Sequence, residues 1–88
     1  MNLNDEIKNC FPKIEELFSE NTLLEFKEKP SDKLYQYHYG VGTWIRNHLL
    51  SDKDDLYHLF QKNSVEDRDD MSACILLMFH IYLNKEKL

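Results

Sequence analysis

The sequence predicts an all-α protein, a compact single-domain bundle of four to five helices covering residues 1–88 around a buried C-terminal helix. Three observations favour this fold class. Apolar residues recur at helical spacing along most of the chain, and two glycines and two prolines are too few for a loop-rich or all-β protein. Residues 71–83 are apolar on nearly all sides. Because a helix that is apolar all round is enclosed by other helices, we expect residues 71–83 at the centre.

Two amphipathic helices are expected in the N-terminal third. Residues 7–18 place apolar side chains at the i, i+3, i+4 and i+7 positions of one helix face. Proline is tolerated in a first turn, so Pro12 suggests that this helix begins near Asn9, after a short turn or a kink. Ser19 is expected to cap a second, short helix, which ends before Pro30.

The third helix is expected to run from Ser31, its N-cap, to about Leu50. It contains the segment 37–47, YHYGVGTWIRN, with both glycines and the only tryptophan. A glycine inside a helix costs about 1 kcal/mol relative to alanine. We therefore expect Gly40 and Gly42 to permit the close approach of another helix, and Trp44 to be largely buried. A phosphate-binding loop is not predicted, because no strand precedes the glycines.

Two further helices complete the expected bundle. A turn at residues 51–55 precedes a short fourth helix, which closes at residues 62–64. The last helix is expected to begin near Asp67, its N-cap, with Asp70 at the third position as in a capping box. Asn84 is expected to end it.

Arg46, Asp69 and Asp70 are predicted to join the third and last helices. An arginine on a buried helix face needs carboxylate partners, and the two aspartates open the neighbouring helix. Removing one partner of such a buried pair is expected to cost about 3–5 kcal/mol. A recognition site and, less favoured, catalysis are the alternatives for Arg46. No nucleophile stands beside a base and an oxyanion stabiliser, so the sequence predicts no catalytic residues and no enzymatic activity.

The remaining chemistry-bearing residues predict no metal and no cofactor. Cys10 and Cys74 lie far apart without ligand spacing and are expected to be reduced, buried thiols. The histidines also lack ligand spacing, and His80 is expected to be a hydrogen-bonded core residue. The N-terminus is polar and acidic, and residues 71–83 are too few to span a bilayer, so we expect a cytoplasmic protein without membrane association.

The charge distribution predicts a protein partner. A net charge of −5 without a basic stripe disfavours nucleic-acid binding and favours a basic protein. Seven acidic residues fall between positions 51 and 70, and some of them cap helices. Tyrosines are frequent interface anchors. The predicted partner-binding residues are Asp52, Asp54, Asp55, Glu66, Tyr35, Tyr39 and Tyr57. A solvated acidic surface and tyrosines packed at the edge of the core are the alternatives.

Two segments resemble the motifs of a small bacterial family, domain-of-unknown-function family 6794. The first is the aromatic-Gly-x-Gly-x-Trp-Ile-Arg-Asn run that ends at Asn47, and the second is the Asp-Asp-Met-Ser step at residues 69–72. The resemblance covers roughly residues 15–84. Many members carry an aromatic-rich segment after the first motif, where this chain has His48, two leucines and an acidic turn. This variable connection is a candidate for specificity.

Some small acidic members of the family resemble toxin-immunity proteins. Together with the acidic charge and the lack of a catalytic set, this resemblance leads to one functional hypothesis: a cytoplasmic, non-enzymatic immunity protein that binds a basic, nuclease-like bacterial toxin, such as one used in contact-dependent growth inhibition. The alternative is a housekeeping helical adaptor or self-associating domain without a toxin partner. The sequence leaves the oligomeric state open.

Overall fold

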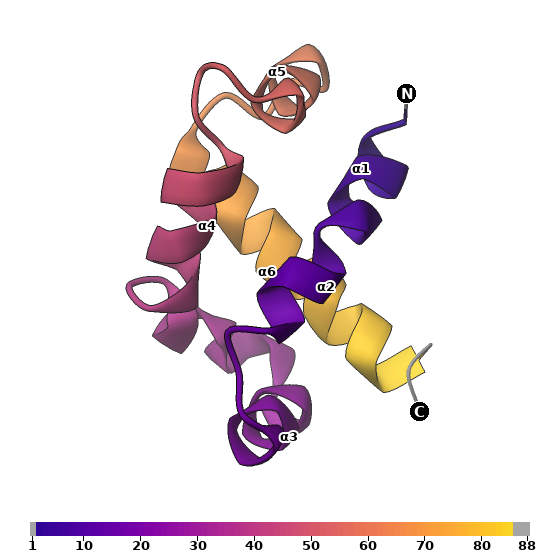
Figure 1. The fold of residues 1–88 in the computed structure, drawn as a ribbon, viewed down its shortest axis with the longest axis vertical. Helices are drawn as coiled ribbons and strands as arrows, with labels where there is room; N and C mark the ends of the chain where they lie inside the picture. Colours follow the sequence, from indigo (N-terminus) through magenta and orange to yellow (C-terminus); the bar gives the residue numbers. More distant parts are fainter. Residues whose placement is uncertain (1, 86–88) are drawn as a thin grey trace.

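This computed structural model describes residues 2–85, which contain six α-helices and one 3₁₀-helix (Figure 1). In chain order they are α1 (Leu3–Asn9), α2 (Phe11–Glu15), α3 (Glu20–Glu28), η1 (Ser31–Tyr37), α4 (Val41–Leu49), α5 (Asp55–Lys62) and α6 (Arg68–Lys85). No strand occurs among these residues, so the predicted all-α fold class is confirmed. The elements outnumber the predicted four to five because α1 was not predicted and the predicted helix from Ser31 to Leu50 is divided in two.

The C-terminal helix α6 is the central element, as its apolar sequence predicted. It packs against η1, α1, α3, α4 and α5, and in Figure 1 it crosses behind α2 on a diagonal. Met71, Ile75 and Phe79 on its inner face are fully buried. The ring centroid of Phe79 lies 5.4 Å from that of Phe11 and 5.6 Å from that of Phe26, which joins α6 to α2 and α3. The radius of gyration, 12.4 Å, is close to the value of about 12 Å expected for a compact domain of this length.

The outer face of α6 is open, so the expectation of a helix enclosed on all sides is wrong. Leu77 and Ile81 are 42% and 44% exposed, and Ala73 is exposed one turn before Leu77. The elements that pack on α6 cover its inner face and its two flanks. A chain of 88 residues supplies too few helices to cover the remaining side.

Helix α1 precedes the first predicted helix, where the sequence had suggested only a short turn or a kink, and a single residue, Cys10, separates it from α2. Helix α2 begins at Phe11 rather than near Asn9, and Pro12 occupies its second position, where the missing N–H leaves no hydrogen bond unmade. Ser19 caps α3 as predicted. Its Oγ accepts from the N–H of Thr22 at 3.2 Å, and its own N–H donates to Thr22 Oγ1 at 2.8 Å, which completes a capping box.

The predicted continuous helix from Ser31 to Leu50 is wrong. Residues 31–37 form the 3₁₀-helix η1, without a side-chain cap from Ser31, and α4 begins only at Val41. The chain leaves helical geometry at Gly40, whose φ and ψ are −87° and −92°. The break lets both η1 and α4 pack against α6.

The sequence predicted that Trp44 would be largely buried, but its side chain is only partly buried. It packs at the edge of the core, and its ring stacks on that of His48 with the centroids 4.6 Å apart. The imidazole of His48 also forms a 3.0 Å hydrogen bond through Nδ1 with the carbonyl oxygen of Trp44.

Short-range hydrogen bonds fix the last two connections. Asp54 Oδ2 accepts from both the N–H and the hydroxyl of Ser51 at 2.9 Å, which closes the turn before α5. Asp67 Oδ1 accepts from the N–H of Asp69 at 3.1 Å, consistent with the predicted N-cap of α6. Helix α6 continues past Asn84 to Lys85. Of the helices within residues 2–85, none has the length and apolar character that crossing a membrane requires.

Candidate protein-binding surface

Arg46 is the centre of a hydrogen-bond cluster between α4, the turn before it and α6. Its Nη1 donates to Ser72 Oγ at 2.9 Å, and its Nη2 donates to the carbonyl oxygen of His38 at 2.9 Å and to Thr43 Oγ1 at 3.1 Å. Its Nε lies 3.5 Å from Asp69 Oδ1. Every guanidinium nitrogen therefore has a partner inside the domain, and the arrangement holds the fold together more readily than it receives a ligand.

The Arg46–Asp69 contact is present, but it differs from the buried pair that the sequence suggested. The Asp69 side chain is 61% exposed, while that of Arg46 is 14% exposed. The second predicted partner, Asp70, is exposed and has no ion pair with Arg46. Solvent screens an exposed carboxylate, so the hydrogen bonds to Ser72 and His38 carry more of the energy than the ion pair does.

The two glycines have different surroundings. A Cβ on Gly42 would lie 3.1 Å from the carbonyl oxygen of Tyr37 and 3.1 Å from Arg46 Nη1, whereas a Cβ on Gly40 would meet nothing within 4 Å. The predicted close approach is therefore found at Gly42 only, and the approaching group is the end of η1 rather than another α-helix. For Gly40 the packing prediction is wrong; its place is the break between η1 and α4.

Three of the four acids predicted to bind a partner are free. Asp52, Asp55 and Glu66 are exposed, and their carboxylates make no hydrogen bond or ion pair with the residues that the structure describes. Asp54 is different, because it is half-buried and accepts two hydrogen bonds from Ser51. The sequence could not distinguish it from its neighbours, since the turn geometry decides which aspartate is used internally.

The connections that carry Asp52 and Glu66 meet at one end of the bundle. Arg68 Nε donates to the carbonyl oxygen of Leu50 at 2.7 Å, which ties the start of α6 to the end of α4. The guanidinium of Arg68 also lies 4.3 Å from the ring centroid of Tyr57 on α5. Arg68 is thus held against the protein here, while Asp52, Asp55 and Glu66 are exposed. We call Asp52, Asp55 and Glu66 the acidic end.

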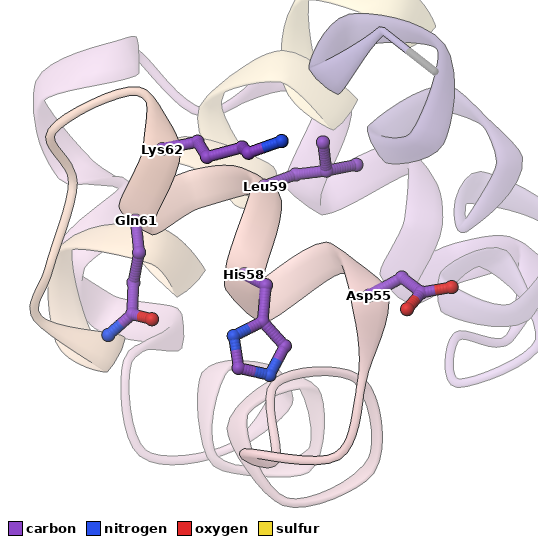
Figure 2. A pocket seen from close by; sticks show the side chains of 5 residues that line it. All are labelled: Asp55, His58, Leu59, Gln61 and Lys62. Atoms are coloured by element: carbon purple, nitrogen blue, oxygen red, sulfur yellow. The ribbon is translucent and has the colours of Figure 1, made fainter.

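Beside the acidic end, α5 borders a shallow hollow lined by Asp55, His58, Leu59, Gln61 and Lys62 (Figure 2). In this view the His58 ring lies between the side chains of Gln61 and Asp55, and Lys62 lies beside Leu59. His58 Nε2 forms a 2.7 Å hydrogen bond with the carbonyl oxygen of Asp52, which fixes the ring. The hollow offers a carboxylate, an ammonium group, an imidazole, an amide and an apolar side chain, a set suited to contact with another protein.

The three predicted tyrosine anchors do not form one surface. Tyr35 and Tyr39 are 68% and 86% exposed, but the break at Gly40 places them on η1 and in the turn rather than on one helix face. Tyr57 lies on α5, is partly buried and accepts a 3.0 Å hydrogen bond from Gln61 Nε2. Figure 1 separates α5 from the region of α3 and η1. Only Tyr57 adjoins the acidic end.

A second hollow, which the sequence did not reveal, lies between η1 and α6. It has a volume of about 340 Å³ and is mostly apolar. Its lining consists of Ser31, Asp32, Leu34, Tyr35, His38, Ala73, Leu76 and Leu77. The small residue Ala73, four positions before Leu77, was the one sign of this hollow in the sequence. The apolar residues around it predicted instead that the whole helix would be enclosed.

The thiols and His80 have structural surroundings. Cys10 and Cys74 are free and partly buried, and burial raises the pKa of both thiols above the ordinary value. His80 Nε2 forms a 2.7 Å hydrogen bond with the carbonyl oxygen of Lys29, as expected for a core histidine. Within residues 2–85, no group of three or more histidine, cysteine, aspartate or glutamate side chains is placed to hold a metal ion.

Comparison with known proteins gives a family without an assigned activity. The family described as a domain of unknown function, DUF6794, matches residues 5–83, so the chain belongs to this family. No curated protein and no solved structure matches the chain.

Proposed function

We propose that this member of the DUF6794 family is a non-enzymatic immunity protein, which acts in the cytoplasm by binding a basic, nuclease-like toxin and blocking its active site. The observation that carries the proposal is the acidic end: Asp52, Asp55 and Glu66 are exposed and unpaired among the described residues. Carboxylates without internal partners are available to a cationic partner, whereas Asp54 and Asp69 are already engaged.

The mechanism follows from the charge of the target. An enzyme that cleaves nucleic acid has cationic groups where the phosphates bind, and carboxylates of a protein inhibitor can occupy the same positions. The net charge of −5 would speed the encounter with such a surface. Beside the carboxylates, Leu59 and the ring of Tyr57 would supply apolar contact, and Gln61 would supply an amide hydrogen bond.

The proposal is tested with the protein encoded by the gene immediately upstream in the source genome. We expect its expression to stop bacterial growth and co-expression of this chain to restore growth. The test variant reverses Asp52, Asp55 and Glu66 to lysine. The control variant reverses Glu16, Glu20 and Glu28, which are equally exposed and lie on the α2 and α3 side. Both variants change the charge equally.

Calorimetry measures the affinity of each variant for the purified toxin domain. We expect the acidic-end variant to bind at least about tenfold more weakly in low salt and to lose protection, while the control variant stays within about threefold. The difference should shrink in 1 M salt, where the screening length falls to about 3 Å. Equal losses in both variants would rule out this surface, and a harmless upstream product would count against the immunity role.

A further inference from the structure

The open face of α6 carries apolar side chains that the fold leaves uncovered. Ala73, Leu77 and Ile81 follow one another at i, i+4 and i+8 and are all exposed. Cys74 is partly exposed beside them. Residues at these spacings form a continuous apolar stripe along one side of a helix. A stripe of this kind on a water-soluble surface marks a contact with another apolar surface.

Hollows flank the stripe on both sides, so the surface is shaped rather than flat. On one side, Leu77 and Ala73 border the hollow beneath Leu34 and Tyr35 of η1. On the other side, Ile81 borders a smaller apolar hollow that also includes Phe11 of α2. A ridge between two hollows is complementary to a second helix whose side chains enter those hollows.

The charges at the ends of the stripe identify the partner. Asp70 lies on the same face in the first turn of α6, and Lys85 lies in the last turn. Both are exposed, and neither has an ion-pair partner among the described residues. An α6 helix running in the opposite direction would set each Asp70 against a Lys85. A helix face with a carboxylate near one end, an ammonium group near the other and an apolar middle is therefore complementary to its own copy.

We propose that two copies of this chain associate through the open faces of their α6 helices, which pack antiparallel about a two-fold axis. With Asp70 of each copy opposite Lys85 of the other, the axis passes between positions 77 and 78, next to Leu77 in the middle of the stripe. Cys74 then lies opposite Ile81. One helix face per copy belongs to the class of small interfaces below about 1,200 Å², so the dimer is weak and depends on protein concentration.

Sedimentation over a range of protein concentrations tests the pairing. The unmodified chain should shift from monomer to dimer as concentration rises, and Leu77→Glu should remain monomeric throughout. Leu24→Glu is the matched control, because Leu24 on α3 is also an exposed leucine, at 51%, and lies outside the stripe. A chain that stays monomeric at the highest concentration, or an equal effect of the two substitutions, would overturn the proposal.

Charge exchange tests the direction of pairing. Asp70→Lys alone and Lys85→Asp alone should each weaken the dimer several-fold, whereas the double variant should regain most of the lost association. A circular dichroism spectrum of each variant checks that the helices remain. A double variant that is weaker than either single variant would exclude the antiparallel arrangement.

Disulfide trapping tests the register. In a background with Cys10→Ser and Cys74→Ser, Leu77→Cys should cross-link the two copies under mild oxidation, because position 77 lies next to the axis. Ile81→Cys in the same background should not, since two copies of position 81 lie about 10 Å apart along the helices. Cross-linking at both positions would indicate parallel pairing and refute the model of the interface.

The proposed dimer and the proposed immunity role can be tested independently of each other. The acidic end lies on the connections around α5, and the three carboxylates reversed in that experiment are not part of the stripe. Reversing them should leave the concentration dependence of sedimentation unchanged, and Leu77→Glu should leave toxin affinity unchanged.

Discussion

Arg46 Nη1 donates to Ser72 Oγ over 2.9 Å and thereby joins α4 to a residue 26 positions further along the chain. Ser72 is 1% exposed, and its hydroxyl in turn donates to the carbonyl oxygen of Asp69 at 3.0 Å. The guanidinium thus satisfies a buried polar group at the contact between the two helices. Four consequences of this and other contacts can be measured.

Arg46→Ala should lower the free energy of unfolding by about 2–3 kcal/mol, because it removes several hydrogen bonds from a charged donor. Asp69→Ala should lower it by less than about 1 kcal/mol, because that side chain is 61% exposed and its ion pair is screened. Urea denaturation followed by circular dichroism gives both values. Equal losses would mean that the ion pair, rather than the bonds to Ser72 and His38, dominates.

Gly42→Ala should destabilise the protein by about 1–3 kcal/mol, because the new methyl group would press on the backbone carbonyl of Tyr37. Gly40→Ala should change the free energy of unfolding by less than about 0.5 kcal/mol, since its Cβ meets nothing within 4 Å. Thermal unfolding of the pair provides the comparison. A stabilised Gly42→Ala variant would show that η1 can move away.

Phe79→Ala should destabilise by about 3–5 kcal/mol, because its ring packs among those of Phe11, Phe18 and Phe26 and its removal leaves a cavity. Leu77→Ala, only two positions earlier, should cost about 1 kcal/mol in the monomer, because the Leu77 side chain is 42% exposed and only part of it is removed from water. Chemical denaturation at low protein concentration separates this effect from self-association. Similar losses would contradict the assignment of inner and outer faces.

Cys10 and Cys74 should react slowly with iodoacetamide in the folded protein. Burial raises the pKa of both thiols, so at pH 8.5 the folded chain holds less of the reactive thiolate than the chain in urea does. Because the folded pKa lies above the unfolded pKa, the thiols favour the folded state fully at pH values below the unfolded pKa. The free energy of unfolding then falls as pH rises through the folded pKa. Alkylation that is as fast in buffer as in urea would disprove this prediction.

The helical character and the central place of α6 could be predicted because apolar periodicity reports the inner face directly. The division at Gly40 could not, because a glycine lowers helix stability only slightly, and the contacts of η1 and α4 with α6 decide whether the chain bends there. The open face of α6 was missed for a related reason. Its sequence is apolar on every side, and sequence does not reveal how many neighbours are available to cover it.

The candidate site was predicted in part. Exposure of Asp52, Asp55 and Glu66 follows from their polar surroundings in the sequence, but the use of Asp54 by Ser51 depends on the exact turn. Tyr35 and Tyr39 do not lie on one helix, because the predicted continuous helix is interrupted after Tyr37. The capping of α3 by Ser19, a prediction that needs only local sequence, was confirmed, whereas the predicted helix from Ser31 to Leu50 is interrupted.

The position of α6 also determines when this domain can fold during protein synthesis. Helices α1, α3, α4, α5 and η1 all pack on a helix that the ribosome makes after them. Until residues 68–85 have left the exit tunnel, Phe11 and Phe26 lack Phe79, the α6 ring on which both of them pack. The earlier helices therefore stay loosely packed and prone to aggregation until α6 is available. The domain then folds in one late step, when α6 packs against them.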